Sequence, residues 1–475
     1  MAESPTLVQQ LAAFMARTAA GHYPAEIRAA ARLHALDTIG IAIAASRLDT
    51  SLALRDYVLE EGGRPAATAI GVPGRVPAAL AALVNGTLAH SLDYDDTHLP
   101  SIVHPSASVV PAVLAACEAL GTGGATAVAA IAAGIEVCVR LGMVGYDPEG
   151  RDSIFFSRGQ HATSICGAIA AAGAVAAASG QGEELIAHAM AIAASMASGI
   201  IEGNRTGGTV KRMHCGWAAH SAVSAAGLAR HGFTGPPTVF EGHFGFFRAF
   251  LGDRSFPAAA TDGLGERWEL ARVSFKPYPA NHYTHAGIDA AVTLRRGGVL
   301  ARDVESADLG VAAPTLPTIG QPIEIKRRPK TGYDAKFSAP YTIAAALLGG
   351  GGLGLGLDDF TDELVREPER RRLMDRVSVR ADPDCGRIYP DQFPAVLTLR
   401  TKDGTEHRRE VMTNLGGPQR PLSGAQLVRK FEDNARTVLE PAAVGRIVDL
   451  ISRLDQLAEA GACLRPLAGP AGAGL

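Results

Sequence analysis

The segment AEIRAAARLHALDTIGIAIAAS (25–46) shows the pattern that dominates the first half of the chain. Its apolar residues recur at the spacing of an α-helix. The segment LVQQLAAFMART (7–18) repeats this pattern, and the chain stays rich in alanine to about residue 250. Breaks fall at Gly/Pro-rich points such as GVPGRVP (71–77) and FTGPPT (233–238). We therefore predict a large all-α domain with many helices.

Strand-like segments begin after about residue 270. They are VESADLGVAAPT (304–315), RVSVRADP (376–383) and AVLTLRTKDGTEHRREV (395–411). In the last of these, Asp403 and Gly404 lie between two alternating runs, which predicts a β-hairpin. The segment FSAPYTIAAALLG (337–349) predicts a helix between the strands. The glycine run that follows it lacks the Lys-Ser/Thr ending of a phosphate loop, so we interpret it as a helix stop.

Amphipathic helical patterns return at the end of the chain, in residues 422–439 and 442–461. A chain of 475 residues is too long for one ordinary core. We predict a mainly α fold with an α+β part, in which a smaller module is inserted into one helical domain. The predicted division is an all-helical domain of residues 1–272 and 421–475 and an α+β lid domain of residues 273–420.

The composition excludes several classes of protein. Hydrophobic residues make up 47% and charged residues 20%, a globular balance, and the net charge of −3 favours neither nucleic acid nor a membrane as partner. None of the six cysteines forms a C-x-x-C pair, which disfavours a zinc or iron–sulfur site. The start MAESPTLVQQ has no basic region followed by an apolar core. We expect a reduced, cytoplasmic protein.

The stretch AHSLDYDDTHLPSIVHPS (89–106) crowds ionisable side chains between apolar segments. Such side chains are costly to bury unless they are paired, bound to metal or used in chemistry. Neither EF-hand spacing nor an H-E-x-x-H motif occurs in the stretch, which disfavours a metal site. Its ionisable residues are Asp93, Asp95, Asp96, His90, His98 and His104.

Basic residues and histidines gather in four further segments. These are RGQHATS (158–164), NRTGGTVKRMHCG (204–216), FKPYPANHYTH (275–285) and KRRPKTGYDAKFS (326–338). Glycine-rich basic turns at helix starts suit anionic ligands, because backbone N–H groups and cationic side chains converge there. Together with the acidic stretch they indicate proton transfer on a small carboxylate substrate. A lone basic cluster such as KRRPK is more often a solvated surface.

The motifs resemble those of a known family. The run Asp93-Tyr-Asp-Asp-Thr97, followed by His104-Pro105-Ser106, resembles the hallmark of the MmgE/PrpD family. The resemblance continues in the correct order over nearly the whole chain. Further similar segments are RGQHATS around His161, KRMHCGWAAHSA from Lys211, FKPYPANHYTH from Lys276, GYDAKFSAPYTIAAALLGG (332–350) and PLSGAQLVRKF (421–431).

The resemblance implies a helical domain with a smaller α+β lid, usually as a homodimer, with the site between domain and lid. It also implies action on small di- or tricarboxylates without metal or organic cofactor. Carried over, the catalytic residues would be Asp93, Thr97, His104, His161, Lys211 and Lys276. As substrate-binding candidates we add Arg158, Arg205, His282 and His285.

These residue types suit a dehydration, which removes a proton next to a carboxylate and protonates a departing hydroxyl. His104 or His161 could serve as base or acid near neutral pH, and Lys211 or Lys276 could stabilise the developing charge. Asp93 could orient an imidazole or handle the proton itself. We predict a cofactor-independent hydro-lyase for a small hydroxy-di- or tricarboxylate such as 2-methylcitrate.

Three alternatives stay open. The same residues could serve an epimerase or isomerase of the iminodisuccinate epimerase type, or a cis-aconitate decarboxylase. By the resemblance, decarboxylases carry a histidine near Asn281 and a tyrosine near Ile325, which this chain lacks, although His282 is one position away. The third alternative is a non-catalytic helical scaffold. Within the acidic stretch we expect Asp95 and Asp96 to shape the turn. We expect His90 and His98 to be structural.

Overall fold

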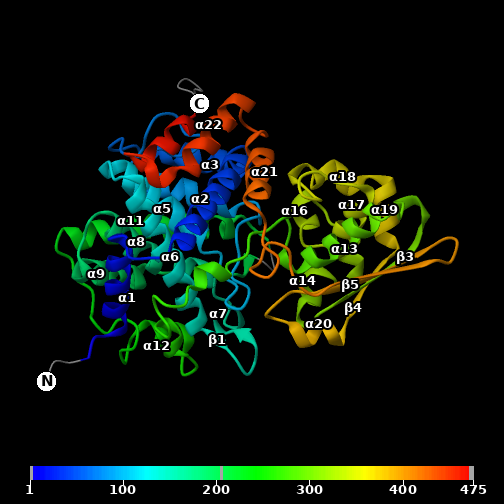
Figure 1. Cartoon of the computed structure of the whole chain (residues 1–475), viewed down its shortest axis with the longest axis horizontal. Helices are drawn as coiled ribbons and strands as arrows, with labels where there is room; N and C mark the ends of the chain where they lie inside the picture. Colours follow the sequence, from blue (N-terminus) through cyan, green and yellow to red (C-terminus); the bar gives the residue numbers. More distant parts are fainter. Residues whose placement is uncertain (1–3, 204–206, 470–475) are drawn as a thin grey trace. The chain divides into compact units, whose positions relative to one another are not determined.

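The structure is a computed structural model that describes residues 4–203 and 207–469. The chain forms two compact units (Figure 1). The helical unit comprises residues 1–91, 95–273 and 434–475, and the mixed unit comprises residues 92–94 and 274–433. The predicted class, mainly α with an α+β part, is confirmed. The predicted domain bounds at 272 and 420 stay a prediction.

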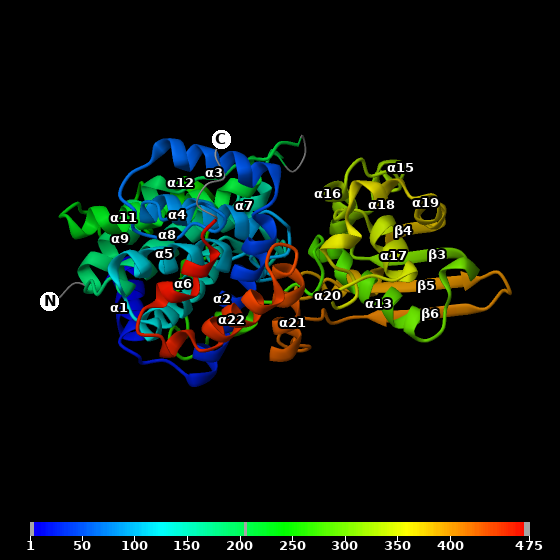
Figure 2. The same cartoon turned by 90° about the horizontal axis from the view of Figure 1, so that it is seen from above.

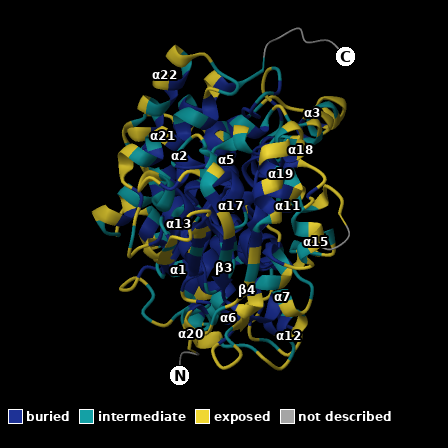
Figure 3. Ribbon diagram, turned by 90° about the vertical axis from the view of Figure 1, so that its right-hand side faces the viewer, coloured by how far each residue is buried: buried dark blue, intermediate teal, exposed yellow. Residues whose placement is uncertain are grey.

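The helical unit is built from apolar helices rich in alanine and glycine. Their exposed residues lie on outer helices such as α3 and α22, whereas central helices such as α5 are buried (Figure 3). Its helices are α1 (Leu7–Ala19), α2 (Ala25–Ala45), α3 (Asp49–Glu61), α4 (Ala78–His90), α5 (Ser106–Leu120), α6 (Gly124–Val144), α7 (Ile154–Ser157), α8 (Ala162–Ala178), α9 (Glu183–Met196), α11 (Val210–Arg230), α12 (Phe246–Leu251) and α22 (Pro441–Ser452).

Two glycines allow helices α4 and α11 to touch backbone to backbone. A Cβ atom placed on Gly86 of α4 would lie 2.8 Å from the Cα atom of Gly216 of α11. A Cβ atom placed on Gly216 would collide with the carbonyl oxygen of Leu83 and the hydroxyl of Thr87. This close approach holds the last residue of α4, His90, near the first turns of α11.

Helix α6 is long and apolar enough to cross a membrane, but 94% of its most apolar part is buried within the unit. It carries a buried ion pair, in which Arg140 Nε lies 2.6 Å from Glu136 Oε1. The remaining Arg140 donors bond to backbone carbonyls of residues 262, 263 and 267. Both charges are therefore satisfied, as expected of a helix at the centre of a core.

The mixed unit contains a four-stranded sheet of strand order β4-β3-β5-β6 (Figures 1 and 2). Strand β3 pairs in parallel with β4 and antiparallel with β5, and β5 pairs antiparallel with β6. The predicted hairpin at Asp403-Gly404 is confirmed. The strands are β3 (Val304–Val311), β4 (Val377–Ala381), β5 (Ala395–Thr401) and β6 (Glu406–Val411).

Helices cover this sheet and close the core of the mixed unit. Helix α13 (His285–Arg296) packs on β5 and β6, and α17 (Ala339–Leu348) packs on β4. The predicted helix stop is confirmed at Gly349, which follows α17 with φ +106°. The other helices are α14 (Leu316–Ile319), α15 (Ile323–Lys326), α16 (Gly332–Ala335), α18 (Asp362–Arg366), α19 (Pro368–Asp375), α20 (Pro383–Ile388) and α21 (Gly424–Ala435), whose last two residues belong to the helical unit.

A small sheet in the helical unit was not predicted. Strands β1 (Tyr146–Asp147) and β2 (Asp152–Ser153) pair antiparallel around a turn that contains Arg151 at φ +51°. Strands of two residues are too short to show an alternating pattern in sequence.

Candidate functional site

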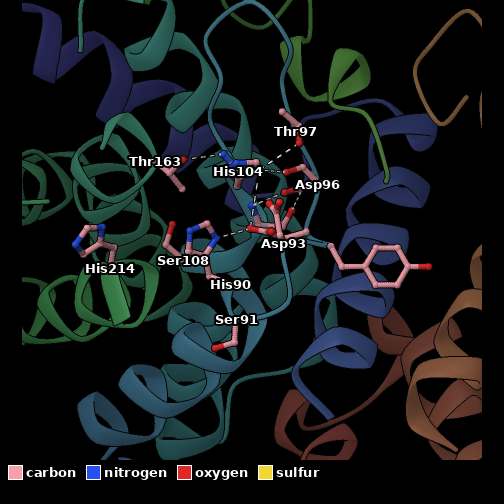
Figure 4. A network of polar contacts seen from close by, with 12 residues as sticks. His90, Ser91, Asp93, Asp96, Thr97, His104, Ser108, Thr163 and His214 are labelled. Atoms are coloured by element: carbon pink, nitrogen blue, oxygen red, sulfur yellow. Dashed lines mark hydrogen bonds and ion pairs between the residues drawn. The ribbon is translucent and has the colours of Figure 1, made fainter. Parts of the chain in front are cut away.

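Four histidines from different parts of the helical unit come together in one cluster. Three of them, His90, His104 and His214, are labelled in Figure 4. His90 is the last residue of α4, and His104 lies in the loop before α5. His161 is the N-cap of α8, and His214 lies in the first turns of α11. We call these four side chains the imidazole row.

The rings of the imidazole row follow one another at short distances. The ring centroids of His104 and His90 lie 5.5 Å apart, and those of His90 and His161 lie 5.3 Å apart. The His161 and His214 centroids are 5.0 Å apart, and their Nδ1 atoms lie 3.0 Å apart, within hydrogen-bond distance. One of these two nitrogens must therefore donate a hydrogen and the other accept it.

His104 has a defined tautomer. Its Nδ1 atom lies 2.5 Å from the carbonyl oxygen of Asp96 and 3.2 Å from Thr97 Oγ1. Because a carbonyl oxygen only accepts, Nδ1 carries the hydrogen, and Nε2 is the basic nitrogen of the neutral ring. The backbone N–H of His104 donates to Thr163 Oγ1 at 3.1 Å (Figure 4). The His104 side chain is 12% exposed, compared with 1% for His90.

Burial keeps the other end of the row neutral. Desolvation lowers the pKa of His161 well below its usual value and lowers the pKa of His214 to about 4. The nearby charges of His90 and Lys211 lower both pKa values further. Both rings are therefore neutral near pH 7, and each can offer a lone pair to a hydrogen-bond donor.

The two aspartates of the loop serve different partners. Asp95 Oδ2 lies 2.7 Å from His90 Nδ1, so Asp95 binds an imidazole, a partner that was not predicted. Asp96 Oδ1 accepts from the backbone N–H of Ser106 at 3.4 Å, as expected for a residue that shapes the turn. Asp96 Oδ2 accepts from the Ser106 hydroxyl and lies 2.8 Å from His34 Nδ1.

Asp93 and Lys276 form a buried ion pair within the mixed unit. Lys276 Nζ lies 2.9 Å from Asp93 Oδ1 and also donates to the Asp93 carbonyl oxygen at 3.1 Å. The side chains are 1% and 5% exposed for Lys276 and Asp93. Asp93 has φ +53°, a left-handed conformation that is uncommon outside glycine. Such a conformation persists only where its surroundings hold it.

Two further lysines bind the neighbouring carbonyl groups. Lys336 Nζ donates to the Leu92 carbonyl oxygen at 2.7 Å, and Lys430 Nζ donates to the Tyr94 carbonyl oxygen at 3.0 Å. The Lys430 ammonium also lies 3.8 Å from the centroid of the Tyr94 ring, a cation–π contact. With Lys276, three buried ammonium groups thus bind three consecutive carbonyl groups. We call this arrangement the lysine clamp.

The predicted substrate-binding histidines lie in the same unit as the lysine clamp. His282 and His285 are both buried, with ring centroids 4.6 Å apart. His285 Nε2 lies 2.9 Å from the Ala280 carbonyl oxygen. Burial, reinforced by the charge of Lys276, lowers the pKa of His285 to about 3, so this ring stays neutral at pH 7.

The predicted cations of the helical unit have different surroundings. Lys211, half-buried in the first turn of α11, acts electrostatically on His161 and His214. Arg158 is exposed at the C-cap of α7. Arg205 lies outside the described residues.

The structure thus gathers the predicted residues in two places. His104 and His161 belong to the imidazole row, Thr97 contacts His104, and Lys211 acts electrostatically on His161. Asp93 and Lys276 pair in the mixed unit, with His285 nearby. Within residues 4–203 and 207–469, no group of three or more His, Cys, Asp or Glu side chains is arranged to hold a metal ion. All six cysteines are buried thiols without disulfide partners.

Sequence reasoning missed several contributors to these clusters. His90 was expected to be structural, and Lys336 and Lys430 had no assigned role. Position in the acidic stretch was the only sequence signal for His90. Lys336 directly follows α16, and Lys430 lies within α21. They lie 244 and 336 residues along the chain from the carbonyl groups that they bind. No local pattern reports such a contact.

Comparisons with known proteins identify related chains. Two family models match, the MmgE/PrpD N-terminal domain over residues 9–259 and the MmgE/PrpD C-terminal domain over residues 278–456. The cis-aconitate decarboxylase of Mus musculus is 28% identical, with 92% of this chain and 88% of the relative covered. That of Homo sapiens is 28% identical, with 95% and 92% covered. That of Aspergillus terreus is 25% identical, with 92% and 90% covered.

Proposed function

The chain belongs to the MmgE/PrpD family, and from this premise we propose that it is a lyase that acts on a small polycarboxylate. The relatives named above favour decarboxylation of a tricarboxylate of the cis-aconitate type over the predicted dehydration of 2-methylcitrate. We propose decarboxylation as the first candidate reaction. The identities, 28% and below, leave room for a different substrate of the same class.

The observation that carries this proposal is the geometry of His104 at the end of the imidazole row. A decarboxylation breaks the bond between a carbon and its carboxylate, releases CO₂ and leaves an electron pair that conjugation can spread. One proton must then be added to carbon. His104 Nε2 is the nitrogen that would hold that proton, because Nδ1 already carries the hydrogen bonded to the Asp96 carbonyl group.

Cationic side chains would balance the charge of a polycarboxylate. Lys211 lies close enough to His161 and His214 to lower their pKa values, so its charge is felt throughout that end of the row. A fixed ammonium beside neutral imidazoles favours a carboxylate over a neutral ligand. We propose that Lys211 binds a carboxylate of the substrate.

Dehydration remains the second candidate, because two positions of this chain lack the side chains that decarboxylases carry there. By the family resemblance, decarboxylases have a histidine near Asn281 and a tyrosine near Ile325. In this structure the Asn281 side chain accepts from the Tyr283 N–H, and the Ile325 side chain is 63% exposed. Neither residue can supply an imidazole or a phenol, so a reaction without those groups is favoured by this observation.

One experiment separates the two candidates. The full chain is incubated with cis-aconitate and, separately, with 2-methylcitrate, in buffer containing EDTA, and both CO₂ release and alkene absorbance are followed. Decarboxylation predicts CO₂ and a dicarboxylate product from cis-aconitate. Dehydration predicts new alkene absorbance from 2-methylcitrate without CO₂. The absence of both signals, or equal signals from a His104→Gln variant, would contradict the proposal.

We also propose that the protein is a cytoplasmic homodimer. Helix α11 supports the dimer, since it exposes apolar residues along one side, among them Val210, Met213, Trp217 and Leu228. Light scattering on the purified chain would measure its mass. A monomer at micromolar concentration would contradict this part of the proposal.

A further inference from the structure

We propose that Asp95 and His90 form a positioning dyad that determines where protons reside along the imidazole row. This inference rests on the proposed function, since it assigns to the dyad the control of the proton-transferring histidines. His90 and Asp95 touch no substrate in this scheme and act through His104 and His161. Neither residue was assigned a chemical role from the sequence.

His90 lies in the middle of the imidazole row. Its ring lies between those of His104 and His161, with centroid distances of 5.5 Å and 5.3 Å. Any change of charge on His90 therefore acts on both neighbours at short range. The His90 side chain is 1% exposed, so water screens this interaction only weakly.

His90 pairs with the Asp95 carboxylate. The carboxylate oxygen Oδ2 lies 2.7 Å from His90 Nδ1 and can only accept, so Nδ1 carries a hydrogen in every state of the ring. Asp95 is 2% exposed. A second proton on His90 would therefore enter Nε2 and create an imidazolium whose counter-charge is already in place.

The Nε2 atom of His90 is the site at which the ring can take up a second proton. This nitrogen is buried and has no hydrogen-bond partner within the described residues. Buried polar atoms without partners are rare in native structures and require an explanation. A nitrogen that takes up and releases a proton as neighbouring groups change state provides one.

Several titratable groups surround the dyad and respond to its charge. The titratable or charged groups of the packed elements are Asp95, Asp96 and His104 from the loop, His161 from α8, and Lys211, His214 and Cys215 from α11. The charge of His90 lowers the pKa values of His161 and His214, with burial as the larger cause. A positive charge on His90 therefore favours the neutral forms of the two rings.

The test measures the titration of the histidine side chains directly in the free protein. With ¹⁵N-labelled histidine, side-chain ¹⁵N shifts are followed between pH 3 and pH 8, a range that includes the lowered pKa of His214, for the full chain and for His90→Gln. The expected result is that the titration of His161 and His214 moves to higher pH by about one unit in His90→Gln, because a positive charge is lost. Unchanged titrations would overturn the proposal.

His98→Gln is the matched control. His98 is as buried as His90, lies in the same stretch, and bonds to Ser101 rather than to the row. Its substitution should leave the His161 and His214 titrations in place, and an equal shift would show a general structural effect and overturn the proposal. If His90→Gln does not fold, Asp95→Asn gives the answer. Asp95→Asn removes the carboxylate that accepts from His90 Nδ1, so the side-chain ¹⁵N shifts of His90 should change, and unchanged shifts would again overturn the dyad.

Activity provides the second readout. For a substrate that turns over, the acidic limb of the kcat/KM profile should move to higher pH in His90→Gln and stay in place in His98→Gln. KM should change less than kcat, since the dyad does not bind substrate. If no substrate turns over, the proposed function fails, while the NMR result still decides the dyad independently. A moved NMR titration with an unmoved acidic limb would contradict the control of proton transfer.

Discussion

His104 is the residue on which the proposed chemistry depends most. Its hydrogen bond to the Asp96 carbonyl group sets the tautomer, and its exposure exceeds that of His90. We expect His104→Gln to lower kcat by about 10²–10⁴-fold, the usual contribution of a general acid or base. The free energy of unfolding should change little, because glutamine can keep the bond to Asp96.

The measurement is steady-state kinetics with whichever of cis-aconitate and 2-methylcitrate turns over, together with urea unfolding. His188→Gln is the control, because His188 lies outside the row, where its Nδ1 accepts from the Gly235 N–H and its Nε2 lies 3.9 Å from the exposed Glu184. A His104 variant with wild-type kcat would remove this residue from the chemistry.

The Asp93–Lys276 pair gives a second prediction at the scale of residues. Removing one partner of a buried ion pair leaves an uncompensated charge, which costs about 3–5 kcal/mol. We expect Lys276→Met and Asp93→Asn each to destabilise the protein by roughly that amount. The double variant should be more stable than the sum of the two losses predicts, since no charge is left unpaired. A double-mutant cycle by urea unfolding measures this coupling, and additive losses would argue against it.

At the scale of elements, the lysine clamp holds residues 92–94 of the mixed unit. Lys336 and Lys430 each bind a carbonyl group next to Asp93, whose backbone is left-handed. We expect Lys336→Met and Lys430→Met to lower the free energy of unfolding by about 1–3 kcal/mol each, because each leaves a buried carbonyl group without its donor.

The control for the clamp is Lys402→Met. Lys402 is exposed in the β5–β6 hairpin, so its substitution should change the free energy of unfolding by less than about 0.5 kcal/mol. Equal effects of Lys402→Met and Lys336→Met in urea unfolding would contradict the clamp.

The contact between α4 and α11 provides another prediction at this scale. A methyl group on Gly216 would collide with the Leu83 carbonyl oxygen, so we expect Gly216→Ala to force the helices apart. The loss of stability should exceed about 2 kcal/mol, since overpacking in a tight core typically costs 1–3 kcal/mol or more. Activity should fall as well, because His90 and His214 lie on these two helices.

Gly227→Ala is the matched control on the same helix. A Cβ atom at Gly227 meets no atom within 4 Å, so alanine should stabilise α11 by up to about 1 kcal/mol through its helix propensity. Thermal unfolding of both variants measures the difference. Similar midpoints for Gly216→Ala and Gly227→Ala would mean that the helices are not in close contact.

At the scale of the whole molecule, buried histidines predict sensitivity to acid. Burial lowers the pKa of His98 in the helical unit and of His285 in the mixed unit to about 3 each. The unfolded chain binds more protons between about pH 6.5 and the folded pKa values. The stabilisation is therefore present above about pH 6.5 and is lost as the pH falls toward about 3.

Each of these histidines should contribute a slope of up to about 1.4 kcal/mol per pH unit within that window. Urea unfolding at pH 8, 6 and 5 measures the slope. His98→Gln should flatten it relative to the wild type, whereas His22→Gln, at an exposed position, should not. A slope that His98→Gln leaves unchanged would contradict the assignment.

Much of the fold follows from local patterns in the chain. The predicted strands from residue 304 onward became β3, β4, β5 and β6, and the helical segments became helices. The second C-terminal helix was predicted to reach residue 461 but ends at Ser452, and a short 3₁₀ turn follows at Leu454–Gln456. Apolar spacing continues beyond that point, but a pattern of spacing does not show where the backbone leaves the helix.

The sequence by itself determined the elements and pointed to the acidic stretch, because periodicity and unusual composition are local properties of a chain. Only the tertiary structure decided which side chains meet there. It placed His90 in the imidazole row, paired it with Asp95, and brought Lys336 and Lys430 to residues 92 and 94. The position of His90 depends on how α4 packs on α11, here through Gly86 and Gly216, and packing joins residues that no local pattern connects.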